Sequence, residues 1–269
     1  MNSHEQSRAY WNELAECYQR ETRIACDDFH YGPLLPGDAD LGLLPDQLDG
    51  QTCLELACGA AQNSVFLSKR GAACTAVDVS EAQLSTARGL AAAHDADIVF
   101  MQASIDALPF ADSAQFRLVH TNSLGFSADP AELTRRATAL LAPGGTFISA
   151  TNHAAFAGEW LELDDEETGM FLTDYFHPPS DVRAAPEARG AVVCCRSYPP
   201  SEVCRWYREA GLVIDAVLAP PAQEGPAAGA RRCRRRSRRS WRRRRRRSGA
   251  STARCARWPA SACPRRTSP

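Results

Sequence analysis

The sequence has no apolar run of the roughly 18 residues that a membrane-spanning helix needs, so we expect no membrane association. It lacks the basic and then apolar start of a secretory signal, which favours a cytoplasmic protein. Because the chain lacks an export signal, its 11 cysteines are expected to be reduced thiols rather than a disulfide framework. They include no CxxC pair, so no metal site is predicted. No repeat at solenoid spacing is present. These absences favour a globular intracellular chain without a bound metal.

Acidic residues are missing from residues 231–269, which hold 17 of the 31 Lys and Arg residues. Residues 1–230 therefore carry 14 basic against 32 acidic residues, a balance of −18. A body this acidic is a poor nucleic-acid binder. The arginines of the tail would still attract phosphates without sequence preference. Nucleic acid is thus expected as a partner only non-specifically, through the tail. A protein that binds or methylates RNA or another nucleic acid by means of this tail is the alternative function.

The same tail lacks Val, Ile, Leu, Phe, Met and Tyr between residues 231 and 269. A segment without these side chains cannot bury enough apolar surface to fold, so we predict disorder over 223–269. Its Arg, Ala, Pro and Gly composition is typical of a GC-rich gene translated out of frame, which is our interpretation. A polybasic interaction arm is the alternative.

Short apolar runs alternate with helical patterns in residues 51–152. Such alternation predicts an α/β fold with a doubly wound, mostly parallel sheet. Ser80 is a good N-cap for the second of these helices. The predicted strands are 52–57, 74–79, 98–101, 116–120 and 146–150, and the predicted helices are 61–70, 81–94 and 130–141, the last ending at Pro143-Gly144-Gly145.

The rest of the chain is predicted to flank this core. Residues 1–50 would form an N-terminal helix, over 5–21, and a lid segment, and residues 153–200 an inserted substrate lid. Residues 201–222 would finish the α/β core, with a helix capped by Ser201 and a strand over 212–218. The apolar strand that should then follow is absent from the tail, so the last strand of the sheet is expected to be missing.

The turn after the first strand carries the chemistry. Ala57-Cys58-Gly59-Ala60-Ala61 joins the strand to a helix, where backbone N–H groups and a helix N-terminus bind nucleotides. Asp78 ends the second strand, where a carboxylate can accept the hydroxyls of a ribose. The fingerprint GxGxxG is absent, which argues against an NAD(P)-dependent oxidoreductase.

Four motifs in order carry a family resemblance: Leu54–Gly59, Val77–Ser80, Ala107–Phe110 and Leu141–Thr146. The sequence resembles the class I S-adenosylmethionine-dependent methyltransferases over residues 5–220. Within that superfamily it is most similar to the small-molecule branch of ubiquinone and menaquinone biosynthesis methyltransferases. The resemblance implies methyl transfer from S-adenosyl-L-methionine to a small-molecule acceptor, by in-line displacement. It leaves open O-, N- or C-methylation and the oligomeric state.

The resemblance also implies roles for individual residues. Ala57 and Gly59 would cradle the methionine part of the cofactor, with Glu55 in support. Asp78 would bind the ribose. Tyr10 and Tyr18 match a pattern of N-terminal tyrosines that closes over the cofactor in this family. Around the adenine and the methyl group the implied cofactor-binding residues are Tyr18, Val79, Gln83, Ser104, Ile105 and Asn122. A plain structural role stays open for each, above all core packing for Tyr10 and Tyr18 and a loop contact for Asn122.

The sequence departs from the family pattern at three places. Ala57 and Ala61 stand where glycines are usual, Ser104 replaces an acidic residue, and Arg117 replaces a common Asp. We expect weaker cofactor binding from these departures, not its loss.

A catalytic base is needed only if the acceptor loses a proton. Histidine suits that task near neutral pH. The candidates are His153, His120 and His30, and a structural role is the alternative for each. Aromatic residues near the expected mouth indicate a partly apolar pocket; they are Phe126, Phe156, Trp160, Tyr175 and Phe176.

Overall fold

The computed structural model describes residues 3–32, 35–111, 114–157, 159–162, 168–172, 174–184 and 191–220. The Arg-rich tail, and with it the predictions of disorder and of frame error, lies outside these residues. Within the described part, no helix has both the length and the apolar character needed to cross a membrane.

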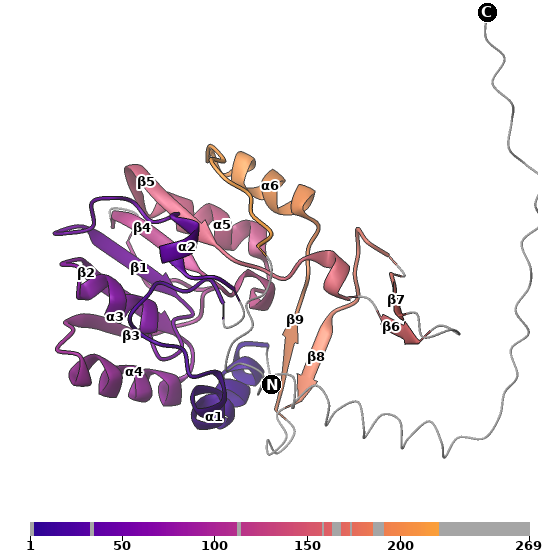
Figure 1. Cartoon of the computed structure of the whole chain (residues 1–269), viewed down its shortest axis with the longest axis horizontal. Helices are drawn as coiled ribbons and strands as arrows, with labels where there is room; N and C mark the ends of the chain where they lie inside the picture. The colour runs from indigo at the N-terminus through magenta and orange to yellow at the C-terminus, as the bar shows by residue number, and fades with distance from the viewer. Residues whose placement is uncertain are drawn as a thin grey trace, which may run out of the picture. The chain divides into compact units, whose positions relative to one another are not determined.

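A parallel sheet of five strands forms the centre of the fold, in the order β3-β2-β1-β4-β5 (Figure 1). Every neighbouring pair in it is parallel. The order reverses at β1 and β4, so the carboxyl ends of these strands border a crevice where open α/β sheets bind ligands. The strands are β1 (Thr52–Leu56), β2 (Ala73–Asp78), β3 (Ile98–Gln102), β4 (Phe116–Thr121) and β5 (Leu141–Ser149).

Helices cover both faces because the buried strands are apolar on both sides. In β1, Cys53 packs in one cluster with Phe66 of α3, while Leu54 packs in another with Leu133 of α5. The connecting helices are α3 (Gln62–Ser68), α4 (Glu81–Ala93) and α5 (Pro130–Ala139). As predicted, Ser80 caps α4, its side chain accepting a hydrogen bond from the Gln83 N–H at 3.2 Å.

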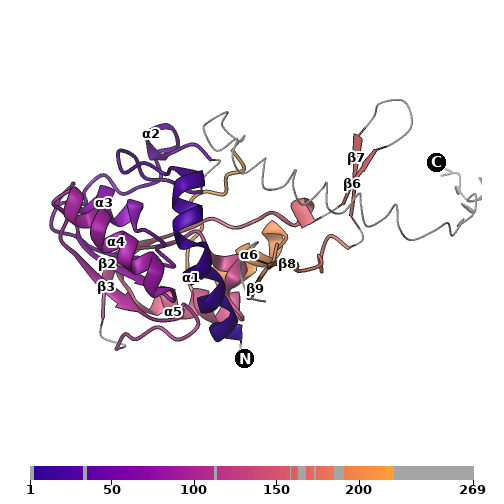
Figure 2. The same cartoon turned by 90° about the horizontal axis from the view of Figure 1, so that it is seen from below.

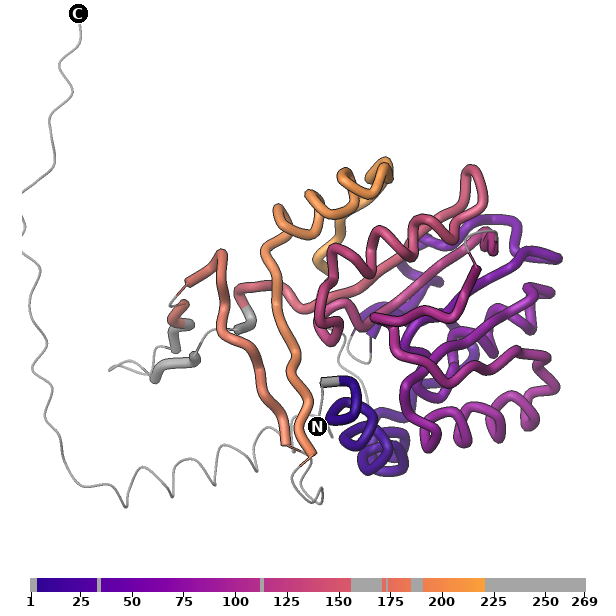
Figure 3. The backbone as a smooth tube through the Cα atoms, turned by 180° about the vertical axis from the view of Figure 1, so that it is seen from behind, coloured from indigo at the N-terminus to yellow at the C-terminus, as the bar shows by residue number. Residues whose placement is uncertain are grey.

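The N-terminal helix α1 (Ser3–Thr22) packs against α4 (Figure 2). It also contacts β9 (Val192–Cys195), which pairs antiparallel with β8 (Asp181–Ala184). The backbone trace in Figure 3 shows β8 and β9 as a two-stranded ribbon beside α1. The other elements are α2 (Asp38–Leu41), the 3-10 turns η1 (Leu124–Phe126) and η2 (Ala154–Ala157), the antiparallel pair β6 (Glu159–Glu162) and β7 (Thr168–Phe171), and α6 (Pro200–Glu209).

Three predictions of local structure are wrong. Residues 212–218 form no strand: Val213 and Val217 are 85% and 63% exposed, because no described strand lies beside them to accept their hydrogen bonds. Pro143-Gly144-Gly145 lies inside β5, which starts at Leu141 and accommodates the turn residues by a register shift against β4. Ser201 is not a cap, since α6 starts one residue earlier at Pro200, a residue suited to the first helical position.

Candidate functional site

The loop from Ala57 to Ala61 bends sharply between β1 and α3. Ala57, Gly59 and Ala61 have φ of 55°, 56° and 58°, so every second residue is left-handed. The curved loop is held by its own hydrogen bonds. The N–H groups of Cys58, Gly59 and Ala61 donate to the Val77 carbonyl, the Asp78 carboxylate and the Cys58 carbonyl respectively. Alanine adopts these angles only at a cost of about 1–2 kcal/mol per residue. The two alanines that replace glycines therefore keep the curved loop but strain it.

Asp78 closes the loop from the end of β2. Its side chain accepts the Gly59 N–H at 2.9 Å and the Ser80 N–H at 2.8 Å, and the residue is only 7% exposed. Burial raises the pKa of Asp78, while these backbone N–H groups act in the opposite direction. A carboxylate has about four acceptor positions, so it can bind further hydroxyl groups beyond these two bonds. Beside it, the Val79 carbonyl accepts a hydrogen bond from the Gln102 side chain at 3.2 Å.

Glu55 lies in β1 on the side of the sheet that α3 covers. One of its oxygens accepts hydrogen bonds from the Ser64 N–H at 2.9 Å and the Ser64 hydroxyl at 2.5 Å. Burial raises the pKa of Glu55 to about 8, against the effect of these bonds, and the nearby charge of Asp78 adds to the rise. Glu55 is therefore a neutral acid at pH 7 that holds the start of α3 against β1.

Helix α1 is joined to the loop by side-chain amides that the sequence did not single out. The Gln19 amide donates to Gln83 at 3.1 Å and accepts from Gln62 at 2.7 Å. Asn12, seven residues earlier on α1, accepts a hydrogen bond from the Ser80 hydroxyl at 2.7 Å. The spacing of Asn12 and Gln19 on one helical face was the available signal. This spacing identifies the polar side of α1, but it does not identify the residues of other elements to which that side bonds.

An aromatic cluster lies where α1 meets η1. Trp11 makes edge-to-face contacts with Tyr18 at 5.7 Å and with Phe126 at 5.6 Å between ring centroids. Tyr10 is buried against β9. Tyr18 is largely enclosed, and burial raises its pKa. Of the other predicted aromatics, Phe176 is 64% exposed and packs on Tyr175, while the side chains of Phe156 and Trp160 lie outside the described residues.

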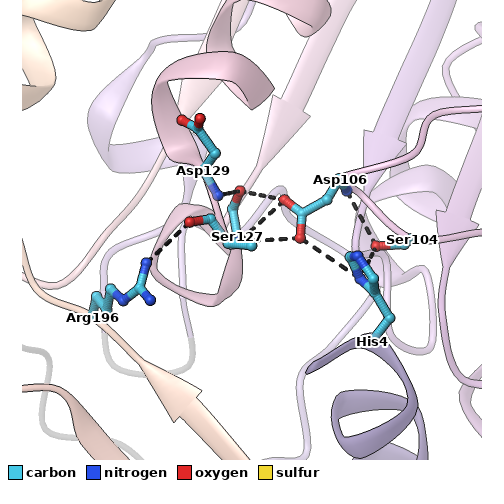
Figure 4. A network of polar contacts seen from close by, with 7 residues as sticks. His4, Ser104, Asp106, Ser127, Asp129 and Arg196 are labelled. Carbon is cyan, nitrogen blue, oxygen red and sulfur yellow. Dashed lines mark hydrogen bonds and ion pairs between the residues drawn. The ribbon is translucent and has the colours of Figure 1, made fainter. Parts of the chain in front are cut away.

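Ser104 belongs to a polar network rather than standing alone (Figure 4). Its hydroxyl lies 2.9 Å from the His4 Nδ1 and accepts the Asp106 N–H at 3.2 Å. Asp106 in turn accepts hydrogen bonds from the Ser127 hydroxyl and from the Ala128 N–H. The network ties the start of α1 to the loops after β3 and β4. Ile105, between Ser104 and Asp106, packs on the apolar cluster around α5.

Asn122 follows β4 and contacts the N-terminal segment. Its side chain donates to the His30 carbonyl at 3.2 Å, and Asn63 donates to the same oxygen at 2.9 Å. Asn63 also accepts the His30 N–H at 2.8 Å. Two asparagines from different elements thus hold His30 over the carboxyl ends of β1 and β4.

Two of the predicted histidines come together here. His120 in β4 is 1% exposed, and its ring packs on Phe29 with centroids 4.8 Å apart. Burial lowers the pKa of His30 to about 4 and that of His120 to about 3, the latter with a contribution from the charge of His30. Within the described residues, the His30 Nδ1 and the His120 Nε2 have no hydrogen-bond partner. Both rings are therefore neutral at pH 7, and each has one buried ring nitrogen without a partner among the described residues.

His153 lies elsewhere, after β5. Its Nδ1 accepts the Ala155 N–H at 3.1 Å, and its ring is 6.0 Å from that of Tyr175. A backbone bridge joins it to Tyr198. The contacts of His153 are thus with Ala155, Tyr175 and Tyr198, whereas His30 and His120 adjoin Asn63, Asn122 and Phe29.

The residues around the loop fit S-adenosylmethionine. A Cβ added to Gly59 would meet only the Gln83 Oε1, at 3.8 Å, so there is room beside the loop at this position. The buried oxygens of Asp78 have acceptor positions that suit a ribose diol. The space at Gly59 and the acceptors of Asp78 therefore both agree with this cofactor.

Comparisons with known proteins agree with the geometry. A family model described as a methyltransferase domain matches residues 53–145. The ubiquinone biosynthesis O-methyltransferase of Stutzerimonas stutzeri is 27% identical over 173 residues, covering 64% of this chain and 68% of that protein. The enzyme of the same name from Alkalilimnicola ehrlichii is 27% identical over 169 residues, 62% of each chain. The chain thus spans about two thirds of these relatives.

Solved structures show the same fold. An S-adenosylmethionine-dependent methyltransferase from Mesorhizobium loti superposes with a TM-score of 0.55 at 25% identity, covering 68% of this chain and 84% of that one. The CcbJ methyltransferase from Streptomyces caelestis gives a TM-score of 0.52 at 20% identity, with 76% and 86% covered.

Proposed function

The chain belongs to the class I S-adenosylmethionine-dependent methyltransferases, and we propose that it methylates a hydroxyl group of a small aromatic molecule. The observation that carries the proposal is the cluster that Trp11 and Tyr18 of α1 form with Phe126. The same helix also bonds to Ser80, two residues after Asp78, and to Gln83. An aromatic cluster favours a flat, partly apolar acceptor. The choice of oxygen rests on the O-methyltransferase relatives. Their names suggest a quinone precursor as the acceptor.

In this proposal, the cofactor occupies the loop between β1 and α3. Ala57 and Gly59 cradle its methionine part, and Asp78 accepts its ribose hydroxyls. Val79, Gln83, Ser104 and Ile105 surround the adenine, with Ser104 in place of an acidic residue. Glu55 supports the loop as a neutral acid, and Tyr18 and Asn122 border the methyl group.

When bound, S-adenosylmethionine supplies a methyl group on a positively charged sulfur, which an acceptor oxygen displaces in line. This chain's own residues align that oxygen and exclude water, from which most of the acceleration can come. Gln19 holds α1 against Gln62 and Gln83, and so keeps Trp11 and Tyr18 over the site. The Ser104 and Asp106 network secures the other end of the same helix.

The three histidines have different parts in this proposal. His30 and His120 are weak bases, because burial lowers their pKa to about 4 and about 3. Each is better suited to accept a hydrogen bond, which in the case of His30 would orient the acceptor hydroxyl. His153 follows the carboxyl end of β5 and is our candidate for the proton acceptor. A fall in kcat of His153→Gln with unchanged binding of S-adenosylhomocysteine would support this role, and an unchanged kcat would refute it.

We further propose that the enzyme acts in the cytoplasm. Cys53 and Cys74 face each other across β1 and β2 as free thiols, which suits a reducing compartment. Nucleic-acid binding, the alternative function, depends on the Arg-rich segment outside the described residues. No observation in the described part favours it.

The test of the cofactor site is calorimetric binding of S-adenosylhomocysteine. Asp78→Ala should weaken binding by about 10- to 150-fold, since a hydrogen bond to a charged group contributes about 1.5–3 kcal/mol. Gly59 and Ser80 bond to different oxygens of Asp78, so Asp78→Asn keeps an acceptor for one of these N–H groups and removes the charge. The Tm of each variant without ligand measures the change in loop stability separately from the change in binding. The exposed Asp46→Asn is the matched control and should bind normally. Unchanged affinity in both Asp78 variants would remove Asp78 from the site.

A further inference from the structure

One cation of the β8 and β9 pair faces the aromatic cluster. Arg183 of β8 lies opposite Val193 of β9 in the antiparallel register. Residues directly opposite each other in such a pair project from the same face. Val193 is 4% exposed and packs against Tyr10 of α1. Arg183 therefore stands on the face that covers α1.

The guanidinium of Arg183 is anchored at one edge only. Its Nε donates to Asp181 at 2.6 Å, and its side chain is 39% exposed. Among the described residues, its two terminal nitrogens have no hydrogen-bond acceptor within reach. The free edge is the one with which arginine binds a carboxylate through two parallel hydrogen bonds.

The aromatic cluster connects the strand of this cation to α1. Val193, opposite Arg183, packs on Tyr10, and the Tyr10 and Trp11 rings make an edge-to-face contact with centroids 5.3 Å apart. Trp11 packs on Tyr18, and the next residue, Gln19, bonds to Gln83 of α4. The β8 and β9 pair and the helix that follows Asp78 are thus both in contact with α1. The positive charge of Arg183 also opposes the burial that raises the pKa of Tyr18.

We propose that Arg183 binds an anionic group, such as a carboxylate, on the methyl acceptor, whose ring lies against Trp11 and Tyr18. This inference rests on the proposed function, since it assigns the substrate class of the same site. Asp181 orients the guanidinium group through its Nε and leaves the two terminal nitrogens to the ligand. Partial burial strengthens the attraction, because the effective dielectric constant is lower there than in water. Arg183 would thereby select acidic acceptors over neutral ones of the same shape.

The test compares two catechols that differ only in charge: protocatechuate, which carries a carboxylate, and its uncharged carboxamide. Binding of each to the protein saturated with S-adenosylhomocysteine is measured by calorimetry, and KM and kcat are measured with S-adenosylmethionine by product mass. The wild type should prefer the carboxylate by about 10- to 100-fold, as expected for a charged hydrogen-bonded pair. Arg183→Gln should lose this preference, and Arg183→Lys should keep part of it.

Arg205→Gln is the matched control, because this exposed arginine of α6 also pairs with carboxylates, those of Glu202 and Glu209. It should leave both catechols unaffected. Normal binding of S-adenosylhomocysteine by Arg183→Gln shows that the variant is folded. An equal change for the two catechols in that variant, or no preference in the wild type, would overturn the inference. Selective carboxylate binding without methyl transfer would uphold Arg183 and refute the proposed O-methylation.

Discussion

Replacing Glu55 by glutamine should remove a pH dependence from the stability of the fold. Glutamine has the shape of the neutral acid and can accept the same two hydrogen bonds from Ser64. In the wild type, the pKa of Glu55 is about 8 when folded, against an ordinary value of 4.5. Between these values the folded state holds one proton more than the unfolded state, so this group's contribution falls as pH rises.

The slope follows from linkage and is about 1.4 kcal/mol per pH unit. Between pH 5.5 and 7.5, the free energy of unfolding of Glu55→Gln should therefore rise by about 3 kcal/mol relative to the wild type. Above pH 8 the difference should level off. His30 and His120 act in the opposite sense at lower pH, because their lowered pKa values make stability rise with pH up to about 6.5. They are present in both proteins and cancel in the comparison.

Urea unfolding of the two proteins at half-unit pH steps, without cofactor, measures this difference. The exposed Glu16→Gln on α1 is the control, and its pH profile should run parallel to that of the wild type. If the Glu55→Gln profile also ran parallel to the wild type, within about 0.5 kcal/mol, Glu55 would titrate normally and its burial as a neutral acid would be refuted.

Two further changes test the strained and tight backbone positions. Ala57→Gly should stabilise the fold by about 0.5–1 kcal/mol, because it relieves a left-handed alanine at φ 55° and the gain exceeds the added freedom of the unfolded chain. Calorimetric melting should show a higher Tm, whereas the neighbour Ala60→Gly, whose φ is not positive, should lower it. Gly125→Ala would place a Cβ 2.5 Å from the Arg196 carbonyl oxygen and should destabilise the β9 contact by about 1–3 kcal/mol in urea unfolding. Gly89→Ala, with open space around it in α4, should instead gain up to about 1 kcal/mol, and the reverse order would contradict the packing.

The central sheet was predictable because its signals are local. The apolar run at β1, the cap at Ser80 and the left-handed turn at Gly59 each depend on residues a few positions apart. The family motifs lie on these elements, so the position of Asp78 at the end of β2 could also be predicted. The roles assigned to these residues stay predictions.

The wrong predictions concern segments whose structure depends on pairing with a strand that is distant in the sequence. Residues 212–218 have the apolar composition of a strand, but a strand exists only when a neighbour accepts its hydrogen bonds, and none is present in the described part. At β5 the reverse happened. Pairing with β4 extended the strand through Pro143-Gly144-Gly145, which by themselves favour a turn.

The sequence by itself determined the alternating α/β core, the glycine turn with its carboxylate, and the kind of cofactor that such a turn suits. Only the tertiary structure decided which distant residues meet there: Gln19 against Gln83, His30 against Asn122, and Val193 against Tyr10. The physical reason is the range of the interactions. Turns, caps and strand runs come from neighbours along the chain, whereas a binding site forms from side chains that packing brings together across elements.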